Sequence, residues 1–263
     1  MPYTVSHTAA VLPFSRWLAP RRLLSAALVG SMVPDLGYLL PQAPPRYVTH
    51  SMIGLFVFCL PAGLVCYWIF QKLIKTPFLE ILPDGAYARA LPCAAPARLT
   101  RIVDWLRAAI GVFAGAVTHL AWDGFTHEGA RGVRMFPALN DDLADVGGHH
   151  LLVYKLLQQG SSAFGLAVVL WVGWRVLRLP PPLPRPARRL GAHEREAWLL
   201  GYPLVAALAS VAALVLGRRF AGGPTAVVGD FAIAVLRGLA FALLAVPVAL
   251  RLRLKVARPS GSP

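Results

Sequence analysis

The sequence predicts an all-α, polytopic transmembrane helix bundle of about six spans, with a short N-terminal helix in addition. Three observations lead to this fold class. The 263 residues are 57% hydrophobic and only 14% charged, whereas a soluble globular chain is about half apolar and about a quarter charged. Apolar runs of span length recur along the chain, and basic residues gather in alternate segments between them. This composition excludes a disordered chain and an ordinary soluble enzyme.

Six apolar runs approach or exceed the roughly 20 residues that a helix needs to cross a bilayer. They lie at residues 23–40, 51–74, 106–125, 150–177, 197–217 and 225–250. Before them, residues 4–15 are mostly apolar and predict a short or re-entrant helix, which at about 18 Å would not span a membrane. We expect three parts: a polar-site membrane bundle over 1–179, a Pro/Arg-rich cytoplasmic linker over 180–196, and two further spans with a basic tail over 197–263.

The basic residues indicate how the chain is oriented. Lys and Arg number 26 against 12 Asp and Glu, a formal net charge of +14. With a cytoplasmic N-terminus, 19 of the 26 fall in cytoplasmic segments and 5 in outer segments. Because cytoplasmic loops collect Lys and Arg, this asymmetry accounts for the charge without nucleic acid. We therefore expect a multi-pass protein of the bacterial inner (cytoplasmic) membrane, surrounded by the lipid bilayer, with a cytoplasmic C-terminus.

A group of ionisable residues stands out near the end of the third run. An ionisable side chain inside a span costs roughly 2.5–3.5 kcal/mol on insertion scales, so it indicates a function. His119, Asp123 and His127 follow one another at intervals of four, and on a continuous helix they fall within an arc of about 80°. Two imidazoles and a carboxylate on one face predict half of a site for a divalent metal.

Two further candidate ligands come from other segments. Asp35 lies at the end of the first run and His50 at the start of the second. In the predicted topology these ends lie on the same, outer side as His119, Asp123 and His127. We therefore expect the five residues to share a site. A re-entrant first helix would bring His7 to the same side.

The alternative interpretation is that these residues are structural. A histidine within a membrane often serves only as a hydrogen-bond partner between helices. Asp35 follows Pro34 and would then cap a helix or a turn. Asp123 would pair with Arg131 or Arg134, which follow it in the outer loop.

Four short motifs carry a resemblance to a known family. They are residues 2–10 (PYTVSHTAA), 30–35 (GSMVPD), 49–56 (THSMIGLF) and 118–127 (THLAWDGFTH). In these motifs and their order the chain resembles an uncharacterised bacterial membrane family, the domain of unknown function numbered 4184.

The chain is also similar, more loosely, to inner-membrane proteins described as metal-dependent hydrolases. That similarity implies a metal-ligand set of His7, Asp35, His50, His119 and Asp123. The sequence departs from the hydrolase pattern at Gly37, where a second acidic residue is frequent.

The leading hypothesis is a metal-dependent hydrolase site at the outer membrane boundary. His119, Asp123 and His50 would hold a divalent ion, zinc by its ligand types, with Asp35 or His7 completing the site. Asp35 or His127 would be the general base. Arg131 and Arg134 would bind the phosphate of a lipid or lipid-linked phosphoester. The rival hypothesis is a non-catalytic membrane protein, either a metal or proton carrier or a scaffold.

Overall fold

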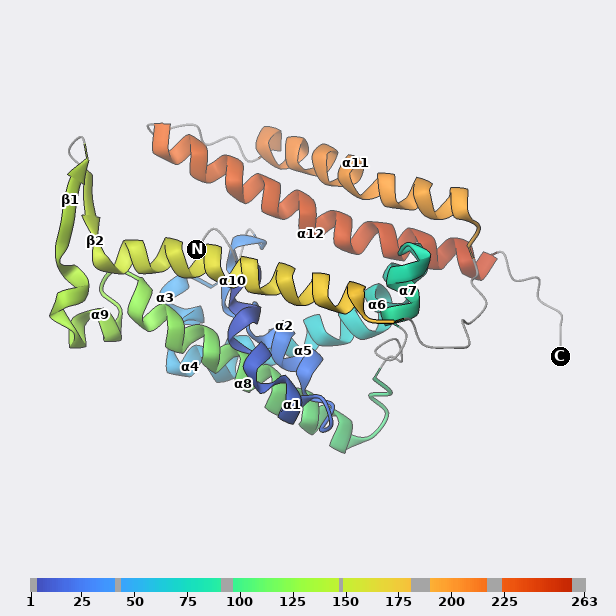
Figure 1. Cartoon of the computed structure of the whole chain (residues 1–263), viewed down its shortest axis with the longest axis horizontal. Helices are drawn as coiled ribbons and strands as arrows, with labels where there is room; N and C mark the ends of the chain where they lie inside the picture. Colours follow the sequence, from blue (N-terminus) through green and yellow to red (C-terminus); the bar gives the residue numbers. More distant parts are fainter. Residues whose placement is uncertain are drawn as a thin grey trace. The chain divides into compact units, whose positions relative to one another are not determined.

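The computed structural model describes residues 4–40, 44–90, 97–146, 149–180, 190–216 and 224–256. Nearly all regular structure in these residues is helical, and the sheet among them is a two-stranded hairpin (Figure 1). The all-α prediction is therefore confirmed. The chain forms two compact units, one from residues 1–67 and 99–175 and the other from residues 68–98 and 176–263.

Five helices within the described ranges are long and apolar enough to cross a membrane, namely Met52–Ile81, Ile102–Thr126, Val153–Arg178, Ala192–Val215 and Ile233–Leu254. The first consists of α4 (Met52–Gly54), η4 (Leu55–Cys59), α5 (Leu60–Ile69), η5 (Phe70–Ile74) and α6 (Lys75–Ile81). The others belong to α8 (Ile102–Thr126), α10 (Val153–Arg178), α11 (Ala192–Leu216) and α12 (Pro224–Val256). The protein is thus a polytopic membrane protein.

The first predicted span, residues 23–40, is not one long helix. It divides into α2 (Leu24–Gly30) and the 3-10 helix η3 (Val33–Tyr38), separated by a turn at residues 31–32. Pro34 explains part of this break, because its ring lacks an N–H and disfavours an α conformation in the residue before it. The described residues therefore contain five long spans where the sequence predicted six.

The segment before α2 is short and runs back toward the same place. It contains η1 (Thr4–Ala10), η2 (Leu12–Phe14) and α1 (Ser15–Leu18). A turn follows, in which Arg22 adopts a positive φ of 60°. The chain then returns through α2 and η3, which bring Asp35 to Thr4. The Thr4 hydroxyl donates to Asp35 Oδ2 at 2.9 Å. The predicted short N-terminal helix is thus one arm of a hairpin of short helices, and both of its ends lie at the polar cluster.

Glycines bring α2 and α8 into direct backbone contact. A Cβ on Gly115 would lie 2.0 Å from the backbone oxygen of Ala27, and one on Gly30 would lie 2.1 Å from that of Val112. Such close approach is typical of small residues at membrane helix interfaces. Beside this contact a buried core is formed by Val33, Leu55, Cys59 and Ala116. This packing sets the position of α2 and η3 along the axis of α8.

The remaining elements of the first unit flank α8. The short helix α3 (Arg46–Thr49) precedes His50. After α8 come α9 (Arg131–Met135) and η7 (Pro137–Asn140), and then the antiparallel strands β1 (Asp142–Val146) and β2 (His149–Leu152). The hairpin leads directly into α10, as Figure 1 shows.

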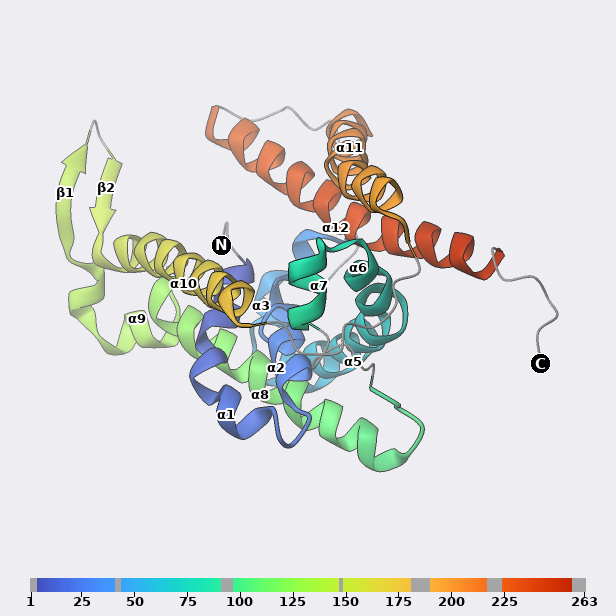
Figure 2. The same cartoon turned by 45° about the vertical axis from the view of Figure 1, so that its right-hand side comes forward.

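The second unit contains the paired helices α11 and α12, which lie side by side in both views (Figures 1 and 2). Gly238 allows this contact, since a Cβ there would lie 2.4 Å from the backbone oxygen of Ala206. Ile81, Leu190 and Leu250 form its buried core. A short helix, α7 (Asp84–Ala90), also belongs to this unit. Most of the predicted linker at 180–196 falls on residues 181–189, outside the described residues, and the predicted domain boundaries stay a prediction.

Candidate metal centre

Four of the predicted ligands meet at one point in the first unit. Asp35 comes from η3, His50 follows α3, and His119 and Asp123 occupy the last two turns of α8. Each offers one nitrogen or oxygen atom, and the four atoms lie within 4.8 Å of one another. His119 is fully buried, and Asp35 and Asp123 are nearly so. The segments that the sequence predicted to converge therefore do converge.

The spacing of these atoms fits a small metal ion. His50 Nε2 lies 3.4 Å from both Asp35 Oδ1 and Asp123 Oδ2. His119 Nε2 lies 3.6 Å and 3.4 Å from the same two oxygens. Four ligands around zinc, at about 2.0–2.2 Å in tetrahedral geometry, stand roughly 3.3–3.6 Å apart. The four nitrogen–oxygen distances thus match the edges of such a tetrahedron.

The cluster also concentrates buried polar atoms that lack hydrogen bonds. Five such side-chain atoms occur in the described part of the chain, and four of them are Asp35 Oδ1, His50 Nε2, His119 Nε2 and Asp123 Oδ1. A buried polar group without a partner costs about 1–3 kcal/mol, and more if it is charged. Asp35 Oδ1, His50 Nε2 and His119 Nε2 face one another, which is typical of ligands for a cation, and Asp123 faces both histidines with its other oxygen, Oδ2.

Hydrogen bonds at the far side of each ring set the histidine tautomers. His119 Nδ1 lies 2.7 Å from the Ser31 carbonyl oxygen, which can only accept, so Nδ1 carries the proton. His50 Nδ1 lies 2.9 Å from Thr49 Oγ1, and that hydroxyl itself donates to the carbonyl oxygen of Arg46. In the neutral form of each ring, Nε2 therefore presents a lone pair to the cluster. An oxygen partner of this kind on the other ring nitrogen is usual for metal-ligating histidines.

The pKa shifts around the cluster reflect burial and nearby charge. Burial, and then the neighbouring His119, lower the pKa of His7 from 6.5 to about 4. Burial alone would raise the pKa of Asp35, but the neighbouring imidazoles of His50 and His119 outweigh it and lower this pKa to about 2. For His50, burial would lower the pKa, but the neighbouring carboxylates of Asp123 and Asp35 outweigh burial and raise it. Asp35 is therefore an anion and His7 neutral at pH 7.

His7 also lies at the cluster, in contact with His119 and next to Asp123. Its ring stacks on that of His119 with centroids 3.7 Å apart and an interplanar angle of 22°. His7 Nε2 lies 3.5 Å from Asp123 Oδ1, and the residue is 3% exposed. The N-terminal hairpin explains how a residue so early in the chain arrives here.

His127 occupies a different position from the one that its spacing predicted. Helix α8 ends at Thr126, and His127 has extended backbone angles, so the predicted helical stripe does not continue to this residue. His127 Nδ1 lies 3.3 Å from the carbonyl oxygen of Asp123, and its Nε2 lies 2.9 Å from Gln158 Nε2. Burial lowers the pKa of His127 to about 4. Both ring nitrogens are thus engaged, and His127 is outside the group of four.

Arg46 is a site residue that the sequence analysis did not single out. Its Nη2 donates to Asp123 Oδ2 at 2.7 Å, and its side chain is 40% exposed. The structure pairs Asp123 with this residue, where the structural alternative expected Arg131 or Arg134. The sequence could have indicated Arg46, because it stands four residues before His50 and would lie one turn from it on a helix.

Arg131 and Arg134 lie on α9 and are exposed. Together with Arg46 they line a polar cavity of about 450 Å³. The same cavity is lined by His50 and Asp123. Three arginines and one further acidic residue, Glu128, thus line the cavity beside the cluster. The arginines outnumber the acidic residues and would suit an anion.

The family of the chain follows from comparison with known proteins. The family described as "Domain of unknown function (DUF4184)" matches residues 1–248. The comparisons with curated proteins and with solved structures returned no match, so the looser similarity to metal-dependent hydrolases stays a prediction. The match includes every motif that carried the resemblance and every residue of the cluster, and the chain belongs to the DUF4184 family.

Proposed function

We propose that this membrane protein is a metal-dependent hydrolase whose ion, zinc by its donor set, is held by Asp35, His50, His119 and Asp123. The observation that carries the proposal is the convergence of four buried side chains from three segments; in three of them the converging atoms, Asp35 Oδ1, His50 Nε2 and His119 Nε2, have no hydrogen-bond partner. Two imidazole nitrogens with two carboxylates form a mixed donor set that zinc accepts. The oxygen partners behind His50 and His119 support it, since they hold both rings in the tautomer that ligation requires.

The reaction class we infer is hydrolysis of a phosphoester. Water adds to phosphorus, the bond from phosphorus to the alcohol oxygen breaks, and the alcohol leaves with a proton. When bound, a divalent ion would polarise the phosphoryl oxygen and lower the pKa of water toward 7. Arg46, Arg131 and Arg134 border the polar cavity and would bind the phosphate oxygens.

Proton transfer requires an acceptor near the reacting water. Of the two bases predicted from the sequence, Asp35 has its Oδ1 among the four clustered atoms. His127 has hydrogen-bond partners at both ring nitrogens. We therefore assign the proton acceptor to the carboxylate of Asp35, through Oδ2, the oxygen that does not face the two histidines. To His127 we assign the role of holding Asp123 in place.

A lipid or lipid-linked phosphoester is the substrate class that suits this position. His119 and Asp123 lie at one end of a membrane-spanning helix, α8, and the polar cavity is next to that end. A headgroup at a membrane boundary could therefore enter without its lipid leaving the bilayer. From the distribution of Lys and Arg we propose that this is the outer boundary of a bacterial cytoplasmic membrane, with the C-terminus in the cytoplasm.

Metal analysis of detergent-purified protein is the first test. We expect near-stoichiometric zinc in the wild type and its loss in a His119→Ala, Asp123→Ala double variant. The matched control is His150→Ala, Asp142→Ala, which removes an exposed His–Asp pair of the β-hairpin. Folded protein without metal in every variant, even after incubation with zinc, would overturn the metal site and favour the scaffold hypothesis.

Activity is the second test, with phosphatidic acid in mixed micelles and soluble p-nitrophenyl phosphate as probes. Zinc-loaded wild type should release phosphate from the lipid. An Arg131→Gln, Arg134→Gln variant should keep its zinc and show a higher KM. Metal binding without hydrolysis of either probe would favour the metal-carrier hypothesis.

A further inference from the structure

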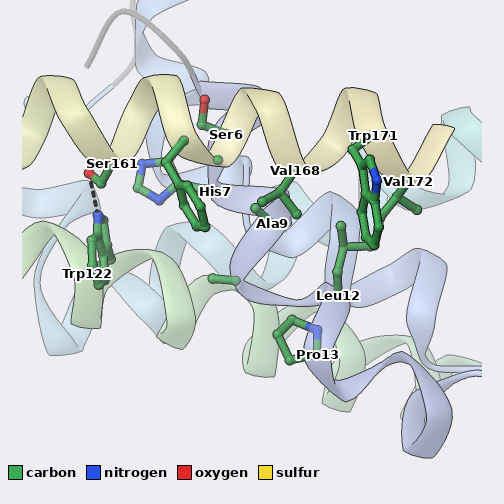
Figure 3. A pocket seen from close by; sticks show the side chains of 13 residues that line it. Ser6, His7, Ala9, Leu12, Pro13, Trp122, Ser161, Val168, Trp171 and Val172 are labelled. Carbon is green, nitrogen blue, oxygen red and sulfur yellow. Dashed lines mark hydrogen bonds between the residues drawn. The ribbon is translucent and has the colours of Figure 1, made fainter. Parts of the chain in front are cut away.

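A second cavity, of about 500 Å³, lies between the N-terminal hairpin and α10 within the first unit (Figure 3). Helices η1 and η2 supply one wall and α10 supplies another. The two walls are joined by a buried hydrogen bond from Ser6 Oγ to the Ser162 carbonyl oxygen, at 2.7 Å. Its volume falls within the range of about 300–1,000 Å³ that is typical of small-ligand sites.

The lining of this cavity changes along its length. Figure 3 shows Ser6, His7, Trp122 and Ser161 toward one end, with Trp122 Nε1 donating to Ser161 Oγ at 3.0 Å. Toward the other end lie apolar residues, Leu12, Pro13, Val168, Trp171 and Val172. None of the lining residues is Asp, Glu, Lys or Arg. The cavity therefore has a weakly polar end and a hydrocarbon end.

His7 joins the polar end of this cavity to the metal cluster. It lines the cavity and also stacks on His119 and lies 3.5 Å from Asp123 Oδ1. Trp122, another lining residue, immediately precedes Asp123 in the chain. The apolar cavity and the four-atom cluster are thus separated by little more than one imidazole ring.

We propose that this cavity binds one acyl chain of a lipid whose headgroup lies at the cluster. Two of its elements, α8 and α10, are membrane-spanning helices, so lipid is the hydrocarbon that surrounds them. An uncharged, elongated cavity with its polar end next to the cluster matches the polarity of an acyl chain near its headgroup. The claim that this lipid is the substrate rests on the proposed hydrolase. Binding of the acyl chain can be measured without any activity.

The test uses a monoacyl phosphatidic acid with a photoreactive diazirine at the end of its palmitoyl chain. After irradiation with full-length protein in detergent, the labelled residues are located by mass spectrometry. We expect labelling at the apolar end, on Leu12, Pro13, Val168, Trp171 and Val172. Val168→Trp fills the cavity and should reduce this labelling to background. Leu170→Trp is the matched control, because Leu170 lies on the same helix, is 63% exposed and does not line the cavity.

Three outcomes decide the inference. Equal labelling of wild type and Val168→Trp, or labelling centred on Leu170 and other residues that do not line the cavity, would overturn it. If Val168→Trp does not fold, competition on wild-type protein decides instead: unlabelled palmitoyl lipid should displace the probe, and glycerol phosphate, which lacks the chain, should not. Equal displacement by both would also overturn it.

Labelling of the His119→Ala, Asp123→Ala variant separates this inference from the proposed function. If neither the wild type nor this variant binds zinc, yet both are labelled at Val168, Trp171 and Val172, the acyl-chain site is sustained and the metal centre is rejected. If the wild type binds zinc but its cavity is not labelled, the metal centre is sustained and the acyl-chain site is rejected.

Discussion

Replacing Gly115 by alanine tests whether the contact between α2 and α8 determines the geometry of the metal centre. The added carbon would lie 2.0 Å from the backbone oxygen of Ala27, whereas ordinary contact begins at 3.4 Å, so the backbones must separate by about 1.4 Å. Ser31 lies one turn beyond Ala27, and its carbonyl oxygen is 2.7 Å from His119 Nδ1. A separation of this size would lengthen that hydrogen bond beyond roughly 3.5 Å, where it is lost.

The expected result is a loss of metal affinity without any change of ligand. Removing the outer partner of a ligating histidine lowers metal affinity by about 10- to 100-fold. Zinc affinity is measured on detergent-purified protein by competition with a chromophoric chelator. Gly124→Ala, also on α8, is the control, because a Cβ there would meet no atom within 4 Å. If Gly115→Ala binds zinc as tightly as Gly124→Ala, the helix contact does not orient His119 and the reasoning is refuted.

Three further predictions concern the same unit. Burial and then His119 lower the pKa of His7 from 6.5 to about 4, so between these pH values the unfolded chain binds more protons at this residue than the metal-free folded protein does. The free energy of unfolding should therefore fall as the pH drops through this window. Thermal unfolding should show a smaller fall in His7→Gln. Thr4→Val removes the donor to Asp35 Oδ2 and should weaken zinc binding about 10-fold in calorimetric titration. Leu55→Ala, at a side chain 1% exposed, should lower the free energy of unfolding by roughly 2–5 kcal/mol, whereas Val57→Ala, at one 62% exposed, should leave it nearly unchanged in denaturant titration.

Much of the fold could be predicted because apolar runs have one stable form in lipid, the hydrogen-bonded helix. The error at residues 23–40 arose from counting apolar residues without regard to the backbone. Pro34 and the turn at residues 31–32 divide that run into two short helices. Hydropathy does not record such a break, since the side chains on both sides of it are apolar. The length of the run therefore predicted one long helix where the chain forms two short ones.

The candidate site was predictable to the extent that its residues lie at the ends of elements. His119 and Asp123 are one helical turn apart, so their proximity follows from helix geometry alone. Asp35 still reaches them although its apolar run is two short helices and not one long one, because a hairpin with both ends at the cluster places it there. The carbonyl oxygen of Ser31 could not be predicted as a partner of His119, because every residue has a carbonyl and only packing selects one.

All residues of the cluster precede α10 in the chain. Thr4, His7, Asp35, His50, His119 and Asp123 lie within the first 123 positions, and the first two long spans carry or adjoin them. During synthesis a chain emerges from its N-terminus, so these side chains can assemble while the last three spans are still being made. Ion capture would then belong to the biogenesis of the protein, with α10 closing the acyl-chain cavity over a centre that already exists.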